Sequence, residues 1–173
     1  PSAHESSVSS TRSVGFARSN ESITVLSAVR CAGSDQKCQN VIVVLDTGRL
    51  MQSPVAQIAK LDYVINAALL LAYVVTGKGD KIGLMTFADD VRHFLSPKSG
   101  KGQFYRMLEQ LYAVEAEPVE PDYRRSLSYL AGKQRKRALV VIFTDLSGGM
   151  SMRNLVSQAA LLAKRSLPLV VTI

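Results

Sequence analysis

Two apolar segments that each end in an aspartate constrain the fold of this chain most strongly. Residues 41–45 run through Val-Ile-Val-Val-Leu into Asp46, and residues 138–144 run through Ala-Leu-Val-Val-Ile-Phe-Thr into Asp145. A short, uninterrupted run of β-branched and other apolar residues is typical of a strand that is buried on both faces of a parallel sheet. The pattern therefore predicts a covered parallel sheet with a carboxylate at the end of each of two strands.

Helix and strand patterns alternate along the rest of the chain. The helical spacing of residues 60–76 stops at Gly77, which is a favourable helix end. The order βαββααβαβ predicts an α/β fold with a doubly wound, mostly parallel sheet, helices on both faces and one short antiparallel edge strand. The expected strands are 41–45, 81–87, 91–95, 138–144 and 169–173, and the expected helices are 60–76, 102–112, 122–131 and 152–165.

The first 40 residues differ from the rest of the chain. They are rich in Ser, Asn, Arg and Gly, and only residues 23–29 have the pattern of a short strand. We predict a disordered or poorly packed segment over residues 1–40 and a domain over residues 41–173. The chain stops within the apolar run 167–173, so we expect that domain to be truncated at its C-terminus.

Cysteine usage and hydropathy restrict the cellular setting. The spacing of Cys31 and Cys38 matches no zinc or redox motif, which favours two ordinary thiols and a cytoplasmic domain. The longest apolar stretch, residues 61–75, contains Asp62 and Asn66 and falls short of the roughly 18 residues that a spanning helix needs. We therefore expect a buried helix, and membrane contact only through segments outside this sequence.

The chain is basic, with 21 Lys and Arg against 14 Asp and Glu. Most of the cations are scattered, but residues 133–137 read Lys-Gln-Arg-Lys-Arg just before a predicted strand. This run should lie at the amino edge of the sheet, away from Asp46 and Asp145. A solvated turn is the favoured interpretation and a patch for nucleic acid or an acidic partner the alternative. No aromatic residue interrupts the run, so we expect no nucleic-acid partner.

The two strand-ending carboxylates are the strongest candidates for a functional site. If their strands are neighbours, Asp46 and Asp145 lie together at the carboxyl edge of the sheet, where ligands of such folds bind. Two close carboxylates repel each other, and a hard cation such as Mg²⁺ relieves that repulsion with few protein ligands. The simpler alternative is that both residues only cap helices or brace loops.

The residues after these strands resemble a known family. Residues 46–51, Asp-Thr-Gly-Arg-Leu-Met, resemble the first metal-site motif of von Willebrand factor A domains, and residues 143–148 resemble their later Asp motif. The core is more specifically similar to the bacterial "domain of unknown function 58" family over residues 41–173. The matching stretches are 45–51, 60–62, 79–84, 120–123 and the strand end at Thr144 and Asp145.

The resemblance implies a degenerate metal-ion-dependent adhesion site. Gly48 and Leu50 stand where the A-domain pattern has hydroxyls, and the loop at residues 120–122 lacks the usual Thr. The resemblance therefore implies weak, altered or absent Mg²⁺ binding. The candidate metal-site residues are Asp46, Asp145, Thr47, Asp122, Glu120 and Ser147.

The resemblance also implies a function. It suggests a protein-interaction module, not an enzyme, that works with a MoxR-type AAA ATPase in complex assembly or chaperone-like work, within a full-length protein that is anchored to a membrane. One alternative is a Mg²⁺-dependent phosphohydrolase with Asp46 as nucleophile, although no general base and no phosphate-binding loop stand out. The other alternative is a structural scaffold that binds no metal.

Overall fold

The computed structural model describes residues 39–146 and 149–173. The strand that the sequence predicts at residues 23–29, both cysteines and Ser147 lie outside these residues.

A five-stranded sheet forms the centre of the domain, in the order β5-β4-β1-β6-β7. The strands are β1 (Asn40–Asp46), β4 (Lys81–Phe87), β5 (Val91–Lys98), β6 (Ala138–Thr144) and β7 (Leu167–Thr172). The central strand β1 pairs in parallel with β4 and β6, and β6 pairs in parallel with β7, whereas β5 runs antiparallel to β4. The mostly parallel sheet with one antiparallel edge strand is therefore confirmed, although β5 is longer than predicted.

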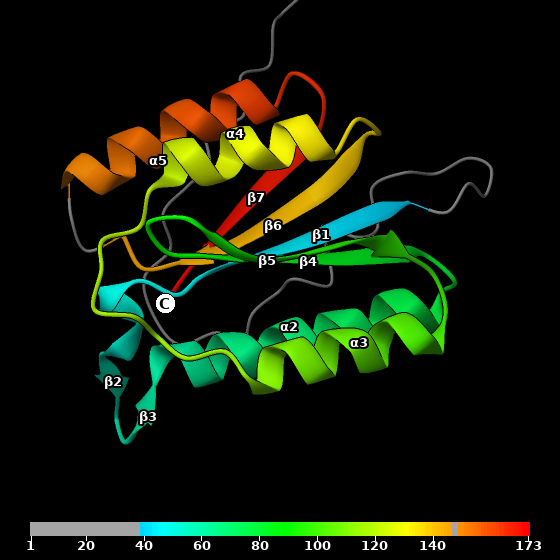
Figure 1. The fold of residues 1–173 in the computed structure, drawn as a ribbon, viewed down its shortest axis with the longest axis horizontal. Helices are drawn as coiled ribbons and strands as arrows, with labels where there is room; N and C mark the ends of the chain where they lie inside the picture. Colours follow the sequence, from blue (N-terminus) through cyan, green and yellow to red (C-terminus); the bar gives the residue numbers. More distant parts are fainter. Residues whose placement is uncertain (1–38, 147–148) are drawn as a thin grey trace, which may run out of the picture. The chain divides into compact units, whose positions relative to one another are not determined.

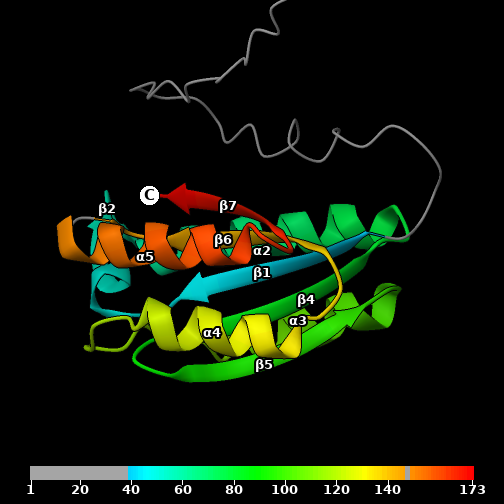
Figure 2. The same cartoon turned by 90° about the horizontal axis from the view of Figure 1, so that it is seen from above.

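Helices cover both faces of this sheet (Figures 1 and 2). On one face lie α2 (Lys60–Gly77) and α3 (Lys101–Tyr112), and on the other lie α4 (Tyr123–Lys133) and α5 (Gly149–Leu162). A helix joins each pair of parallel strands that follow each other along the chain, because a parallel pair needs a long crossover connection. The α/β class and the doubly wound arrangement follow the prediction from the alternating patterns.

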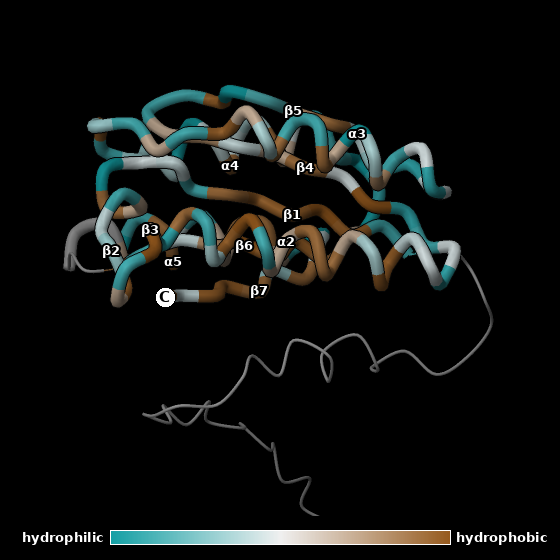
Figure 3. The backbone as a smooth tube through the Cα atoms, turned by 90° about the horizontal axis from the view of Figure 1, so that it is seen from below, coloured by the Kyte–Doolittle hydropathy of each residue, from teal (hydrophilic) through white to brown (hydrophobic). Residues whose placement is uncertain are grey.

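The core lies on both sides of β1, because neighbouring side chains of a strand point to opposite faces. Ile42 and Val44 join the cluster beneath α4 and α5, which includes Tyr123 and Leu127, and every side chain of β1 from Val41 to Asp46 is buried. In Figure 3 the central strands are hydrophobic while the connections at their ends are largely hydrophilic. The connections are therefore free to carry function while the strands hold them in place.

The apolar helix α2 belongs to this packed core. Its hydropathy of 1.3 over 18 residues is high enough for a membrane span by length and composition, a test that core helices of soluble proteins also pass. Leu61, Val64, Ala68, Leu71, Ala72 and Val75 are buried under the sheet. The structure thus places this segment as a helix of the domain, as its Asp62 and Asn66 predicted.

The connection from β1 to α2 contains elements that the sequence patterns did not predict. A short 3-10 helix, η1 (Arg49–Gln52), is followed by a hairpin of β2 (Pro54–Val55) and β3 (Ile58–Ala59). The hairpin projects from the carboxyl edge of the sheet (Figure 1). Each of its strands has two residues, too few for any alternation of apolar and polar positions to be recognised.

Candidate functional site

Asp46 and Asp145 come to the same edge of the sheet. Their strands β1 and β6 are parallel neighbours, with Leu45 paired opposite Phe143, so both chains leave the sheet at the same level. Both aspartates are buried, and the charge of Asp145 contributes to a raised pKa of Asp46. The carboxyl edge therefore holds two buried carboxylates that interact electrostatically.

Asp46 is surrounded by hydrogen-bond donors. Its Oδ1 accepts a hydrogen bond from the Gly48 backbone N–H at 2.8 Å, and its Oδ2 accepts from the Thr144 hydroxyl at 2.6 Å and the Tyr123 hydroxyl at 3.1 Å. The carboxylate is only 2% exposed, and this burial raises its pKa above the usual value, partly offset by the three donors. Asp46 is thus the centre of a buried polar network.

Asp145 is paired with a cation of the chain itself. The Lys60 ammonium, at the first residue of α2, donates to Asp145 Oδ2 at 2.5 Å. The side chains of Lys60 and Asp145 are 16% and 6% exposed, so little water screens this ion pair. The Lys60 ammonium therefore compensates the charge of one of the two carboxylates from within the chain.

Thr47 is turned towards the sheet rather than towards the carboxylates. Its hydroxyl donates to the Phe87 carbonyl at 3.0 Å, and its backbone N–H donates to the same oxygen at 2.8 Å. Its own carbonyl accepts from the Glu117 N–H at 2.7 Å. Thr47 thus ties β1 to the end of β4 and to the connection that follows α3.

Gly48 is packed against the connection that leads into α4. A Cβ atom added at Gly48 would lie 2.9 Å from Pro121 Cδ and 3.0 Å from the Val119 carbonyl oxygen. Distances this short are too close for a side chain, so a hydroxyl residue cannot be accommodated here without moving residues 119–121. In this chain Pro121 occupies the space that a side chain at position 48 would need.

Glu120 and Asp122 have partners other than Asp46 and Asp145. Glu120 forms an exposed ion pair with Arg49. Asp122 caps α4, because its Oδ1 accepts a hydrogen bond from the Arg125 N–H at 2.9 Å. A metal-binding role of these two side chains stays a prediction, and Ser147 lies outside the described residues.

This donor set does not fit Mg²⁺. The ion needs near-octahedral oxygen coordination, whereas both oxygens of Asp46 already accept hydrogen bonds and Asp145 already holds an ammonium group. In residues 39–146 and 149–173, no three His, Cys, Asp or Glu side chains gather closely enough to hold a metal ion. The arrangement instead joins Asp46 to three neutral hydrogen-bond donors and Asp145 to an ammonium group of the chain itself.

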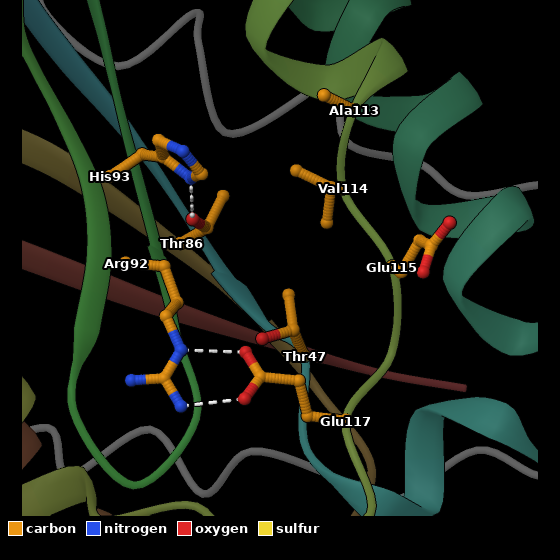
Figure 4. Close-up of a pocket in the computed structure, with 8 residues that line it drawn as sticks. All are labelled: Thr47, Thr86, Arg92, His93, Ala113, Val114, Glu115 and Glu117. Carbon is orange, nitrogen blue, oxygen red and sulfur yellow. Dashed lines mark hydrogen bonds and ion pairs between the residues drawn. The ribbon is translucent and has the colours of Figure 1, made fainter.

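A small pocket opens beside this centre (Figure 4). It has a volume of about 200 Å³ and lies between the ends of β4 and β5 and the connection after α3. The Arg92 guanidinium is held by both oxygens of Glu117 at 2.6 Å and by Asp89 at 2.5 Å. These contacts lower the pKa values of Glu117 and Asp89 below their usual range. The cation that borders the pocket is therefore already neutralised.

Two residues of this site, Lys60 and Tyr123, were absent from the candidates drawn from the sequence. Both lie within stretches that carried the family resemblance, residues 60–62 and 120–123. Their partners Asp145 and Asp46 are 85 and 77 positions away in the chain. The family motifs thus pointed to the positions of Lys60 and Tyr123, but their contacts with Asp145 and Asp46 can be seen only in the folded structure.

Comparisons with known proteins agree with this architecture. Residues 27–173 match the family described as "Protein of unknown function DUF58". The structure of the conserved hypothetical protein BatB from Bacteroides thetaiotaomicron has a TM-score of 0.60 and 18% identity, over 78% of this chain and 66% of that chain. An aerotolerance-related membrane protein from Bacteroides fragilis, crystallised with multiple mutations to serines, has a TM-score of 0.57 and 18% identity, over 78% and 67%.

At these identities the likeness to solved structures concerns the fold, and the chain spans about two thirds of the BatB structure. The VWA domain of SpRpn10 also matches, with a TM-score of 0.45 and 11% identity over 79% of this chain and 89% of that chain. A search of curated protein sequences returns no significant match. The chain belongs to the DUF58 family, and its domain shares the α/β fold of the BatB structure.

Proposed function

We propose that this domain is a protein-interaction module that docks a partner at the carboxyl edge of its sheet and needs no metal ion to do so. The observation that carries the proposal is the β2–β3 hairpin, which presents two apolar side chains to solvent. Val55 is 40% exposed and Ile58 is 46% exposed. Apolar residues at the tip of a projecting connection cost solubility, and they are typical anchors of protein interfaces.

Buried side chains and hydrogen bonds hold the base of the hairpin in one conformation. This order favours a role of the hairpin in binding. Met51 of η1 is fully buried, and Gln52 Nε2 donates to the Ala116 carbonyl at 2.8 Å. The Lys60 N–H donates to the Ser53 carbonyl at 3.1 Å and closes the loop at the residue that also pairs with Asp145. A connection that is ordered before binding loses less entropy when a partner arrives.

The compensated charges of the carboxyl edge support docking without a metal ion. A metal-bridged interface needs an open coordination position, whereas Asp46 and Asp145 are engaged by Thr144, Tyr123 and Lys60. The same engagement argues against catalysis by Asp46, because a nucleophile must reach its substrate and this carboxylate is 2% exposed. We therefore propose binding rather than turnover, with the network serving to hold the edge in shape.

We propose a MoxR-type AAA ATPase as the partner, on the basis of the family resemblance. The test measures the Kd of the full chain for a nucleotide-free ATPase of this type from the same organism. A Val55→Ser/Ile58→Ser variant is compared with a Val156→Ser/Leu161→Ser variant, which changes two apolar residues of α5 that are even more exposed. We expect the hairpin variant to bind at least about tenfold more weakly, as for anchor residues of interfaces.

The expected result is a loss that is confined to the hairpin variant and a wild-type Kd that is the same with and without EDTA. Equal loss in both variants would contradict docking through the hairpin, and no binding at all would rule out this ATPase as the partner. Titration of the full chain with Mg²⁺ and Mn²⁺ by calorimetry tests the metal separately. Binding that disappears in both Asp46→Ala and Asp145→Ala would overturn the metal-free part of the proposal.

A further inference from the structure

The amino edge of the sheet, opposite the edge described above, collects basic residues from four connections. These connections join α2 to β4, β5 to α3, α4 to β6 and α5 to β7, and all four lie at the same end of the domain (Figure 1). In the described chain Asp80 is the one acidic residue within them. The basic residues are Lys78, Lys81, Lys98, Lys101, Lys133, Arg135, Lys136, Arg137, Lys164 and Arg165.

Most of these cations are exposed, and none of them forms an ion pair with an acidic side chain of residues 39–146 or 149–173. All except Lys81 are exposed, and Lys81 is half-buried. Among the described residues every ion pair belongs to a different set of cations, Arg49, Lys60, Arg92 and Arg125. The charge of the amino edge is therefore concentrated on one side of the domain and is not neutralised within it, which creates a positive potential over a broad surface.

Aromatic and apolar side chains lie beside these cations. Tyr73 and Phe104 pack edge to face with centroids 6.2 Å apart, one helical turn from the ends of α2 and α3 that reach the amino edge. Phe104 also packs edge to face on Tyr105. Tyr73 is 68% exposed and Tyr105 is 64% exposed. On the other face of the sheet, Tyr129 lies under the Lys133 ammonium at 5.4 Å.

We propose that the amino edge docks on the surface of an anionic phospholipid bilayer. A flat membrane fits cations that come from four separate connections along a whole sheet edge, since it can meet all of them at once. Each Lys or Arg near such a surface contributes about 1 kcal/mol of attraction. Tyrosine rings with an apolar body and a polar tip are favoured at the boundary between lipid and water.

Nucleic acid is the competing anionic partner, and the aromatic geometry argues against it. Single-strand binders stack bases on open aromatic faces along a basic groove. Here Tyr73 and Tyr105 each pack edge to face with Phe104, and the Lys133 ammonium lies over the Tyr129 ring. The basic run 133–137 itself contains no aromatic residue. The surface therefore has the charge for a nucleic acid but lacks the stacking platform.

The test is co-sedimentation of the full chain with vesicles of phosphatidylcholine alone or mixed with phosphatidylserine, at low and high NaCl. An amino-edge variant, Arg135→Gln/Lys136→Gln/Arg137→Gln, is compared with a carboxyl-half variant of the same net charge, Arg49→Gln/Arg124→Gln/Arg153→Gln. All six residues are exposed. About 1 kcal/mol per charge corresponds to about a fivefold change in partition coefficient, so the loss of three charges should weaken binding to anionic vesicles about a hundredfold.

A second pair of variants tests the aromatic residues. Tyr73→Ser/Tyr105→Ser removes rings at the amino edge, whereas Tyr112→Ser removes a 93% exposed ring at the opposite end of α3. Only the first is expected to weaken binding that persists at high salt. Equal losses in the two charge variants, or no preference for phosphatidylserine, would overturn the proposal. Tighter binding to a single-stranded oligonucleotide than to vesicles, lost in the amino-edge variant, would assign the surface to nucleic acid instead.

Discussion

The two edges of the sheet treat their charges in opposite ways. At the carboxyl edge Lys60 is bonded to Asp145 and Arg92 to both Asp89 and Glu117, so cations and carboxylates compensate each other locally. At the amino edge the basic residues of the four connections form no ion pair with a described residue. Charged side chains at the carboxyl edge thus form ion pairs within the domain, whereas those at the amino edge are exposed to solvent.

The difference shows why net charge alone is a poor guide to this domain. The formal charge of +7 is a property of the whole chain, and the sequence suggested scattered cations with one basic run. The fold brings that run together with lysines from three other connections. It also hides Lys60 next to Asp145. The role of each charged residue therefore depends on the strand directions, because these decide which connections lie at the same end of the sheet.

The largest effect is expected from removing the cation of the carboxyl edge. Lys60→Met leaves Asp145 buried without its ammonium partner, and breaking one side of a buried ion pair costs about 3–5 kcal/mol of unfolding free energy. Urea denaturation followed by circular dichroism measures the change. Lys136→Met at the amino edge is the matched control and should change stability by less than about 0.5 kcal/mol. Similar losses in the two variants would remove the distinction between the edges.

A smaller effect is expected from the hydroxyl of Tyr123. Tyr123→Phe keeps the ring and its edge-to-face contact with Phe87, but it removes a donor to Asp46 and a contact with Thr144 at 2.8 Å. Losing a partner of a buried carboxylate should lower the unfolding free energy by about 1–3 kcal/mol. Tyr129→Phe, whose hydroxyl has no hydrogen bond to a described residue, should leave it unchanged. Equal denaturation midpoints for both variants would contradict a structural role of the network.

The pH dependence of stability should have opposite signs for buried and exposed carboxylates of the carboxyl edge. Burial raises the pKa of Asp46, so protonated Asp46 stabilises the folded state. This contribution to the free energy of unfolding is fully present below the unfolded pKa of about 3.9 and is lost as the pH rises through the folded pKa. Arg92 lowers the pKa values of Asp89 and Glu117, so their contribution is present above their unfolded values and is lost as the pH falls through the folded pKa.

Urea denaturation across the acidic and neutral range tests the first of these signs. The unfolding free energy of the wild type minus that of Asp46→Asn should decrease as the pH rises from about 4 towards 7. Arg92→Gln serves as the comparison, since it should reduce stability mainly at neutral pH, where Asp89 and Glu117 are charged. A wild-type advantage over Asp46→Asn that grows with pH would mean that the hydrogen bonds, and not burial, dominate at Asp46.

The smallest effect is expected from the cations of the amino edge. Arg135→Gln/Lys136→Gln/Arg137→Gln removes exposed, unpaired charges and should change stability by no more than about 0.5 kcal/mol. The backbone contact from Asn40 Nδ2 to the Arg137 carbonyl, 3.1 Å long, does not depend on these side chains. Thermal unfolding at low and high NaCl should show a slight gain for the variant at low salt, where like charges repel most. A large loss would reveal ion pairs that the structure lacks.

The strands were predicted well because their patterns are local. Residues 81–87 and 138–144 were predicted as strands with the bounds that β4 and β6 have in the structure. Continuous apolar runs bounded by turns carry that information within a few residues. The helix that was expected at 152–165 begins earlier, at Gly149, because glycines give no helical signal.

The candidate site was predicted less completely because its contacts are long-range. Strand-ending aspartates can be recognised in a sequence, but Lys60 reaches Asp145 across 85 residues of chain. Glu120 and Asp122 were suggested because their loop stands where the A-domain pattern has a Thr. In the structure Glu120 pairs with Arg49, and Asp122 accepts a hydrogen bond from the Arg125 N–H. The sequence shows which chemical group a side chain carries. Which residue that group contacts depends on how the chain packs.

The contact between Gly48 and Pro121 makes the two positions depend on each other. A serine at position 48 would place its Cβ 2.9 Å from the proline ring and 3.0 Å from the Val119 carbonyl oxygen, so residues 119–121 would have to move. Residues in direct contact have effects on stability that are not additive. We therefore expect a serine at position 48 to cost less stability when Pro121 is replaced by a smaller residue than when Pro121 is kept.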